Sequence, residues 1–204
     1  MSSENRSIFE SQLLEELKLI AAQFEGVVAS KNKLKFKHNK KVVGELFLEH
    51  LARVDAYVLG GMVYGGEIFD CCSKFTPPYK SNLFSEGCFS FISSGEQNKK
   101  FSRDSGGAIK TPDQSTVREI CAHIRLVLEE YYVPRLLACI VPAKRTINDV
   151  LSSPDEYAYP AIFIHCAAKL EMKFVDESLL NAAMSSKKII KSKDYDIPLL
   201  SALI

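Results

Sequence analysis

Glycine-rich segments can cradle a phosphate, and this chain has one from Val58 to Phe69, VLGGMVYGGEIF. A P-loop needs a lysine and then a serine or threonine directly after its last glycine, whereas Gly66 is followed by Glu67 and Ile68. A carboxylate at that place would repel a phosphate. Because the flanking residues are mostly β-branched or aromatic, we predict a bent strand in which the glycines mark a bulge or the close approach of another group.

Cysteine and histidine supply the remaining side chains with reactive or metal-binding chemistry. The vicinal pair Cys71 and Cys72 could be redox-active or hold a soft metal, but neighbouring residues of a strand point to opposite faces. His165 precedes Cys166, yet adjacent helical residues point about 100° apart, so we expect a buried histidine with its hydrogen bonds satisfied. The chain has four histidines, none at a spacing typical of metal ligands: His38, His50, His123 and His165. We therefore predict no metal site, no cofactor and no enzymatic activity.

The most prominent surface feature is a group of lysines in KNKLKFKHNKK. Lysines alternate with Leu34 and Phe36, which is the period-two pattern of a half-buried strand, so they share one face. Asn39 and Lys40 form a predicted turn that carries the charge further. We predict a partner-binding ridge made of Lys31, Lys33, Lys35, Lys37, Lys40 and Lys41. The alternative is an edge strand that its lysines protect from aggregation. Nucleic acid is not expected, because neither arginine nor an exposed aromatic residue is interleaved with the lysines.

The elements that would position these residues fall into two blocks. Helical spacing predicts a first helix over residues 7–25, ended by Gly26, followed by a hairpin, strands over residues 54–72 and a strand from Cys88 to Ile92. Residues 93–110 are predicted to be a polar loop with a short strand around residues 99–103. A long helix then starts, with Thr111 as its N-cap and Pro112 as its first residue, and Pro134 breaks it or starts a new turn.

The C-terminal part continues with helices. Predicted helix starts are Thr146, Ser153 or Pro160, and Asp176. The helix at Ala161–Leu170 is apolar almost all round and should be central to its lobe. Strands followed by helices in blocks indicate an α+β fold. We predict an antiparallel meander packed against an N-terminal helix and a long central helix, with a C-terminal helical lobe.

Length and composition limit the organisation and the compartment. The 204 residues are 47% hydrophobic with a formal net charge of +1, typical of one globular domain over residues 1–204, in which 7–110 hold helix and sheet and 111–204 are helical. No apolar run approaches the roughly 20 residues that a membrane span needs. The first residues are polar, and Cys121, Cys139 and Cys166 lie among apolar residues as buried thiols would, so we expect a cytoplasmic protein.

The order of elements resembles a known family. It is carried by FESQLLEELKLIAAQF, EEYYVPRLLACI with its Tyr131-x-x-Pro134-x-Leu136 turn, and YPAIFIHCAAKL, over residues 7–184. The chain is similar in these features to an uncharacterised bacterial domain-of-unknown-function family of small α+β proteins, often encoded beside polymorphic toxins. The resemblance implies an immunity protein that neutralises a cognate toxin by stoichiometric binding. The alternatives are an enzyme with an unrecognised site between sheet and helical lobe, and a secretion chaperone or adaptor.

Overall fold

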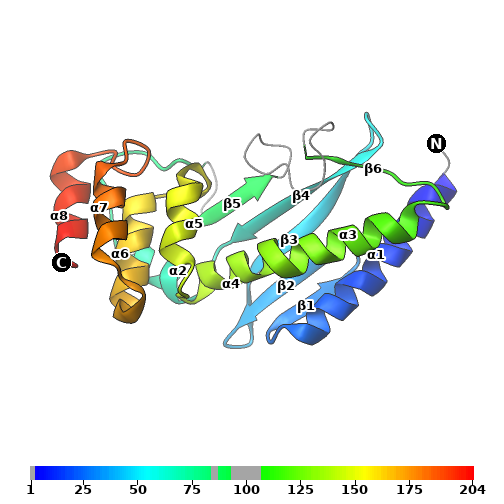
Figure 1. Ribbon diagram of the computed structural model, residues 1–204, viewed down its shortest axis with the longest axis horizontal. Coiled ribbons are helices and arrows are strands. Elements are labelled where there is room, and N and C mark those ends of the chain that lie inside the picture. Colours follow the sequence, from blue (N-terminus) through cyan, green and yellow to red (C-terminus); the bar gives the residue numbers. More distant parts are fainter. Residues whose placement is uncertain (1–2, 84–86, 93–106) are drawn as a thin grey trace. The chain divides into compact units, whose positions relative to one another are not determined.

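The computed structural model describes residues 3–83, 87–92 and 107–204, and the fold is α+β as predicted. The chain runs from an N-terminal helix through a meander of five antiparallel strands to a 24-residue central helix, and ends in helices that pack together (Figure 1). It divides into two compact units. Unit 1 comprises residues 1–61 and 91–134, and unit 2 comprises residues 62–90 and 135–204. The expected single domain stays a prediction.

The sheet follows the order of the chain. Its strands are β1 (Val27–Ser30), β2 (Lys33–His38), β3 (Lys41–Leu51), β4 (Ala56–Val63) and β5 (Phe89–Ile92), and the two-residue β6 (Ile109–Lys110) pairs with the start of β4. Asn39 and Lys40 both have positive φ, at 49° and 67°, which is the geometry of a two-residue type I′ hairpin turn. The predicted hairpin is therefore confirmed. The short strand β1 was not predicted.

Strand β2 is an inner strand. It pairs with β1 on one side, where Val28 faces Lys35, and with β3 on the other, where Lys35 faces Glu45. The interpretation of the lysines as protection for a free sheet edge is therefore wrong, because β2 has no unpaired edge for them to protect.

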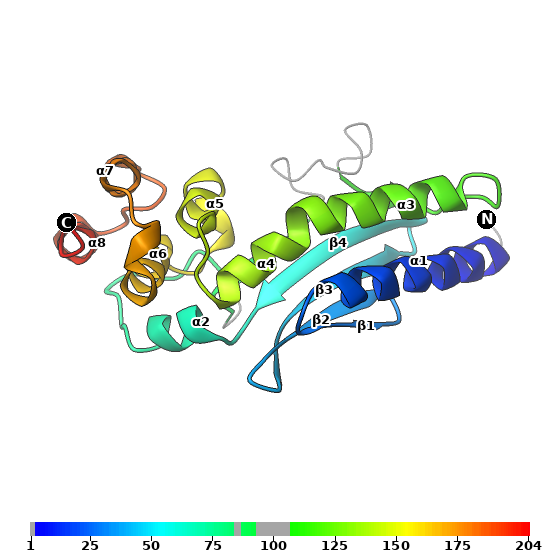
Figure 2. The same cartoon turned by 60° about the horizontal axis from the view of Figure 1, so that its bottom comes forward.

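The core of unit 1 lies between one face of the sheet and two helices. Helix α1 (Ser3–Gln23) packs on β1 and on α3 (Val117–Val127), and Figures 1 and 2 show both helices extended along the sheet. The buried apolar side chains recur at helical spacing in α1 and alternate along the strands: Phe9, Leu13, Leu17, Ile20, Leu34, Phe36, Leu46 and Leu48. Each buried aliphatic side chain of this size stabilises the fold by about 1.5–3 kcal/mol relative to exposure.

The central helix starts later than predicted and passes its proline. Thr111 is not an N-cap: its hydroxyl donates to Asp55 at 2.8 Å, and α3 begins only at Val117. The turn before it is held by Asp113, whose carboxylate accepts from the backbone N–H of Ser115 and Thr116. A π-helical turn, Leu128–Tyr132, then leads into α4 (Val133–Ile140). This turn changes the hydrogen-bond pairing just before Pro134, which has no N–H to donate, so the helix continues.

Unit 2 is mainly helical, and its central helix is the predicted one. Helix α6 (Pro160–Leu170) is buried at every position except Lys169 and Leu170, and it contacts α2, α5 and α8. The other elements are α2 (Glu67–Cys72), α5 (Thr146–Ser152), a 3₁₀ turn at Pro154–Glu156, another at Met172–Phe174, α7 (Glu177–Ser185) and α8 (Lys193–Ser201). Asp176 caps α7 as predicted, accepting from the N–H of Ser178 at 2.8 Å.

The two glycine pairs behave differently. Gly60 and Gly61 lie inside β4, so a strand is confirmed there. The strand ends at Val63, and residues 67–72, predicted to continue the sheet, form helix α2 instead. Gly66 has φ +102°, and a Cβ on it would meet the backbone oxygen of Ile140 at 2.9 Å. Only glycine fits this backbone without strain, and here it turns the chain from strand into helix.

Two further expectations concern the whole chain. In the part of the chain that the structure describes, no helix has both the length and the hydropathy needed to cross a bilayer. Cys121, Cys139 and Cys166 are buried, as predicted. The short strand expected around residues 99–103 lies outside the described residues, as does the predicted loop of residues 93–110 as far as 106, whereas its end at Ile109–Lys110 is strand β6 and not loop.

Candidate functional site

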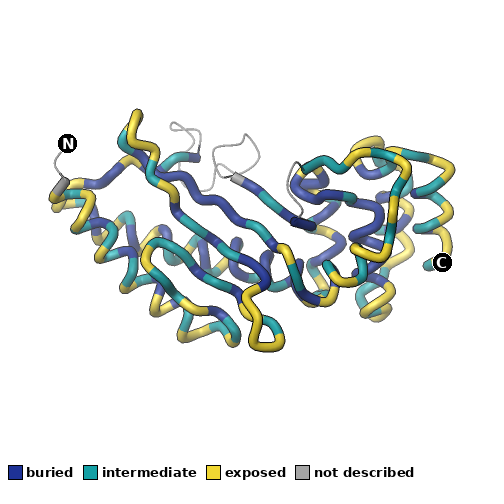
Figure 3. The backbone as a smooth tube through the Cα atoms, turned by 180° about the vertical axis from the view of Figure 1, so that it is seen from behind, coloured by how far each residue is buried: buried dark blue, intermediate teal, exposed yellow. Residues whose placement is uncertain are grey.

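Within the described residues, one face of β1, β2 and β3 in unit 1 carries exposed or half-exposed side chains. Helices α1 and α3 lie on the other face, in front of the strands in Figure 1, and the view from behind in Figure 3 shows β1, β2 and β3 in front of the helices. Because Leu34 and Phe36 point toward the helices, alternation places the neighbouring residues of β2 on the open face. We call this surface the open sheet face and define it by Val28, Lys33, Lys35, Lys37, Val42, Glu45 and Phe47.

The structure brings three of the six predicted lysines together. Lys33, Lys35 and Lys37 alternate along β2 on the open sheet face. Lys31 lies in the turn between β1 and β2, with φ 52°, at one end of β2. Lys40 and Lys41 lie at the other end, in the β2–β3 turn and at the start of β3. The predicted ridge is thus a line of three lysines with charged turns at both ends.

Glu45 partly neutralises the positive charge of the lysines. Glu45 lies directly opposite Lys35 in the strand register and forms an ion pair of 3.1 Å with Lys33. Lys37 faces Val42 beyond a bulge in the register, so the sheet places no acid directly across from it. The basic character of the open sheet face therefore increases from Lys33 toward Lys37.

Apolar residues of the face were not foreseen. Val28 is 38% exposed and Val42 is 37% exposed, both unusually high for valine in a sheet. Phe47 is half-buried, and its ring lies over Gly60 of β4, where any side chain would collide with it. The alternation of Glu45, Phe47 and Glu49 with the buried Leu46 and Leu48 was the signal that could have found Phe47. The place of Val28 on this face could not be predicted, because strand β1 itself was not predicted.

An open depression of about 510 Å³ borders the Lys33 end of the face. Phe47 and Lys33 form part of its wall, together with Arg6, Asn32, Glu49 and His50. It carries both charges and an aromatic ring, which suits a polar side chain of a partner better than a small apolar ligand.

A polar network holds the turn behind this depression. His50 Nε2 lies 3.0 Å from Asp55 Oδ1, which also accepts from Thr111, and these hydrogen bonds keep the pKa of Asp55 below its usual value. Tyr57 donates to Glu10 at 2.8 Å. Partial burial raises the pKa of Glu10, but the hydrogen bonds from Arg6 and Tyr57 together lower it by more. The pKa of Glu10 therefore lies below its usual value. These contacts tie α1 to β4 and the β3–β4 turn to β3 and to Thr111, so we assign them a structural role.

Metal and nucleophile chemistry find little support in the described residues. No group of three or more His, Cys, Asp or Glu residues there is placed to hold a metal ion. His165 is buried, its Nδ1 lies 2.9 Å from the carbonyl oxygen of Leu199, and burial lowers its pKa, so the predicted satisfied core histidine is confirmed. Contact with Cys72 and burial raise the pKa of the Cys166 thiol, which disfavours the reactive thiolate. Cys71 and Cys72 lie on helix α2 and not on a strand.

Comparison with known proteins identifies no relative: no protein-family model, no curated protein and no solved structure matches this chain.

Proposed function

We propose that this protein is a binding module that neutralises an acidic protein partner, a toxin-like enzyme, by stoichiometric binding through the open sheet face. The observation that supports the proposal is a face that the described residues leave uncovered, where three aligned lysines lie beside the exposed or half-exposed Val28, Val42 and Phe47. Apolar residues give an interface its contact area, and surrounding cations steer an acidic partner toward it.

The rigidity of the face favours this use. β2 is hydrogen-bonded on both sides, and its inward residues Leu34 and Phe36 are buried, so the lysine backbone positions are fixed before a partner arrives. Binding to a pre-organised surface loses little conformational entropy. Lys37 is exposed, and Lys33 and Lys35 are half-exposed, which suits long-range attraction more than tight buried contact.

The partner class follows from the charge of the face and from the layout of the chain. A surface led by Lys35 and Lys37 complements carboxylates, so the partner should present an acidic surface. An immunity role is what the resemblance in the order of elements implies, and an inhibitor of this kind would cover the partner's catalytic site. The proposal therefore has two separable parts: acidic-partner binding by the open sheet face, and inhibition of that partner's activity.

The test uses this chain as bait in lysate from its own cells, followed by mass spectrometry. Three baits are compared: the native chain, a variant with Lys33, Lys35 and Lys37 replaced by Glu, and a control with Lys187, Lys191 and Lys193 replaced by Glu. The control makes the same charge change on exposed lysines of unit 2. We expect one stoichiometric partner with the native and control baits, and a loss of about tenfold or more with the face variant.

Because Lys35→Glu would face Glu45, a further bait carries glutamine at the same three positions, and circular dichroism must show that each variant is folded. Equal capture by all baits would overturn the open sheet face as the binding site. The purified partner is then assayed for enzymatic activity with increasing amounts of this protein. A partner that binds at one-to-one stoichiometry without losing activity would overturn the immunity role alone.

A further inference from the structure

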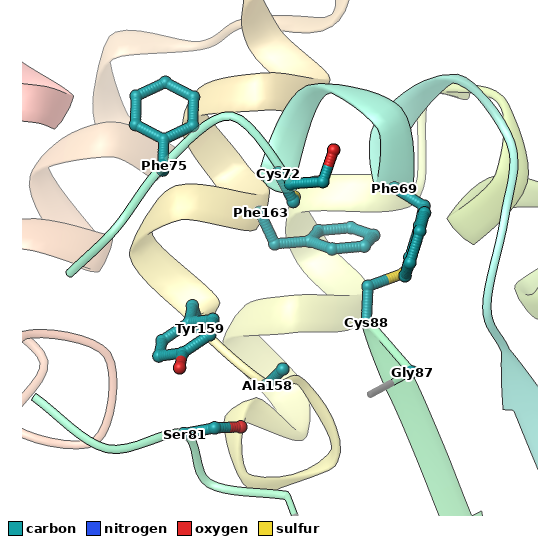
Figure 4. Close-up of a pocket in the computed structure, with 10 residues that line it drawn as sticks. Phe69, Cys72, Phe75, Ser81, Gly87, Cys88, Ala158, Tyr159 and Phe163 are labelled. Atoms are coloured by element: carbon teal, nitrogen blue, oxygen red, sulfur yellow. The ribbon is translucent and has the colours of Figure 1, made fainter. Parts of the chain in front are cut away.

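Unit 2 contains a pocket of about 330 Å³ that the proposed binding role does not use. Figure 4 shows that it lies between helix α2 with the segment after it, the residues around Cys88, and the start of helix α6. All its described lining residues belong to unit 2: Phe69, Cys72, Ser73, Phe75, Ser81, Gly87, Cys88, Ala158, Tyr159 and Phe163. Its volume lies in the range typical of sites for small molecules.

The residues that line the pocket disfavour a charged ligand. None of the described lining residues carries a charged side chain, and four of them are aromatic. Phe163 and Cys88 are buried, at 1% and 6% exposure, so the wall they form is preset by the packing of unit 2. An ion would lose its hydration here without gaining a partner of opposite charge, and an uncharged aromatic molecule would replace water at apolar walls.

Two polar groups of the pocket already donate to backbone oxygens. The Cys88 thiol donates to the carbonyl oxygen of Val63 at 3.5 Å, and the Ser73 hydroxyl donates to that of Asp70 at 3.0 Å. The Ser81 hydroxyl differs: its oxygen accepts from the N–H of Leu83 at 2.9 Å. A hydroxyl that accepts in this way retains its own hydrogen to donate. In the view of Figure 4, Ser81 lies at the opposite end from the rings of Phe69 and Phe163.

We propose that this pocket binds an uncharged aromatic small molecule that carries a carbonyl oxygen. The ring system lies among Phe69, Phe75 and Phe163, and the carbonyl oxygen accepts the hydrogen bond of the Ser81 hydroxyl. An apolar cavity of about 150 Å³ is known to hold one benzene ring, so this pocket is large enough for about two fused rings. Its lining residues belong to unit 2, whereas the open sheet face lies in unit 1.

The test measures binding of acetylnaphthalene, an uncharged two-ring ketone, by saturation-transfer NMR on the full chain. Naphthoate, of the same size but negatively charged, serves as the matched probe. We expect saturable one-to-one binding of the ketone, in the micromolar to millimolar range usual for so few atoms, and no saturable binding of the carboxylate. Failure of the ketone to bind, or equal binding of both probes, would overturn the proposal.

Variants locate the bound molecule. Ala158→Phe fills the pocket and should abolish binding. Ser81→Ala removes the donor and should weaken binding about fivefold, the effect of losing one neutral hydrogen bond. Because Ala158→Phe also alters the packing around a buried residue, Cys72 gives an additional measurement in folded protein. In a Cys71→Ser background, saturating ketone should slow alkylation of Cys72 by N-ethylmaleimide, whereas an unchanged rate would place the ketone elsewhere and overturn the proposal.

Discussion

The phenyl ring of Phe91 occupies the space that a side chain at Gly61 would need. A Cβ on Gly61 would lie within 2.9 Å of its ring and 3.0 Å from Leu46, and both of these side chains are buried. Gly60 has a similar relationship with Phe47 on the opposite face of β4, but Phe47 is half-exposed. Two adjacent glycines therefore each accept an aromatic ring, one in the core and one on the open sheet face.

This difference predicts unequal costs for the same substitution. Gly61→Ala should lower the free energy of unfolding by about 1–3 kcal/mol, because Phe91 and Leu46 have no room to move. Gly60→Ala should lie within about 0.5 kcal/mol of the native chain, because Phe47 can turn toward solvent and alanine reduces the entropy of the unfolded chain. Urea unfolding of the two variants measures both values. Equal destabilisation would mean that exposure of the ring does not decide the cost.

The buried carboxylate of Asp196 should be important for the stability of unit 2. It is fully buried and accepts from Tyr79 at 2.6 Å and from the N–H of Lys191 and of Ser192 at 2.8 and 2.9 Å. In Asp196→Asn the amide oxygen can keep the two backbone N–H groups only if the N–H₂ turns toward Tyr79, whose hydroxyl must then accept instead of donate. Because the charge that strengthens all three hydrogen bonds is also lost, the change should cost about 3 kcal/mol. Tyr79→Phe removes one of the bonds and should cost about 1 kcal/mol. Urea unfolding that ranks the two variants in the opposite order would contradict this account.

His165 predicts a loss of stability in acid. Burial lowers its pKa below the ordinary value of 6.5, and nearby Lys169 lowers it further, so the fold favours the neutral ring. The unfolded chain then binds the proton first. The contribution of His165 to stability is complete above pH 6.5 and is lost as the pH falls toward the lower folded pKa.

The His165 prediction is checked by comparing urea unfolding at about pH 7.5 and about pH 5.5 for the native chain and for His165→Asn. The amide nitrogen of asparagine can take over the hydrogen bond of Nδ1 to Leu199 but does not titrate. We expect the variant to lose less stability than the native chain between the two pH values. An identical loss would show that other groups dominate the acid response.

Replacing Glu45 tests whether the partner is acidic or basic. It neutralises part of the open sheet face through Lys33, so Glu45→Gln should make the face more basic without touching a lysine. Association with an acidic partner should become a few-fold faster at low salt, and the gain should shrink as salt increases. Stopped-flow measurement of the association rate at two salt concentrations gives the answer. A slower association would indicate a basic partner.

The thiols should divide into two classes. Cys71 and Cys72 are partly exposed, whereas Cys88, Cys121, Cys139 and Cys166 are buried. Burial raises the pKa of Cys71 to about 12 as well as those of Cys121 and Cys139, so access to the reagent, and not pKa, separates the two classes. Titration with a chromogenic disulfide should therefore detect two thiols in the folded chain and the remaining four only in denaturant. More than two in the folded chain would show that unit 2 or the α1–α3 core opens readily.

Local sequence patterns were sufficient to predict an element where its hydrophobic periodicity matches the way it packs. The apolar run of α6 was enough to predict a central helix, and the alternation around Leu34 and Phe36 was enough to predict β2 with its lysines on one face. Both signals are repeated over many residues, so no distant contact needs to be known.

Predictions failed where a distant residue decides the local structure. Thr111 looked like an N-cap, but it hydrogen-bonds to Asp55 in the β3–β4 turn, which no local pattern reveals. The six residues of α2 include Ile68 and Phe69, which favour strands, and their packing against α6 is part of what decides for helix. The four-residue β1 was too short to recognise, and Val28 of the open sheet face was missed with it.

The two units interleave along the chain, and this has a consequence for its synthesis. Unit 1 needs residues 91–134 to place α3 against α1, and unit 2 needs residues 135–204 to give α2 its neighbour α6. The hairpins of residues 27–51 pair with near neighbours and can form as soon as they leave the ribosome. A nascent chain that has reached Pro134 holds all of unit 1, while the apolar segment around Ile68 and Phe69 still waits for α6. That segment stays without its partner helix until the last third of the chain is synthesised, and this is the period in which a chaperone would be needed to protect it.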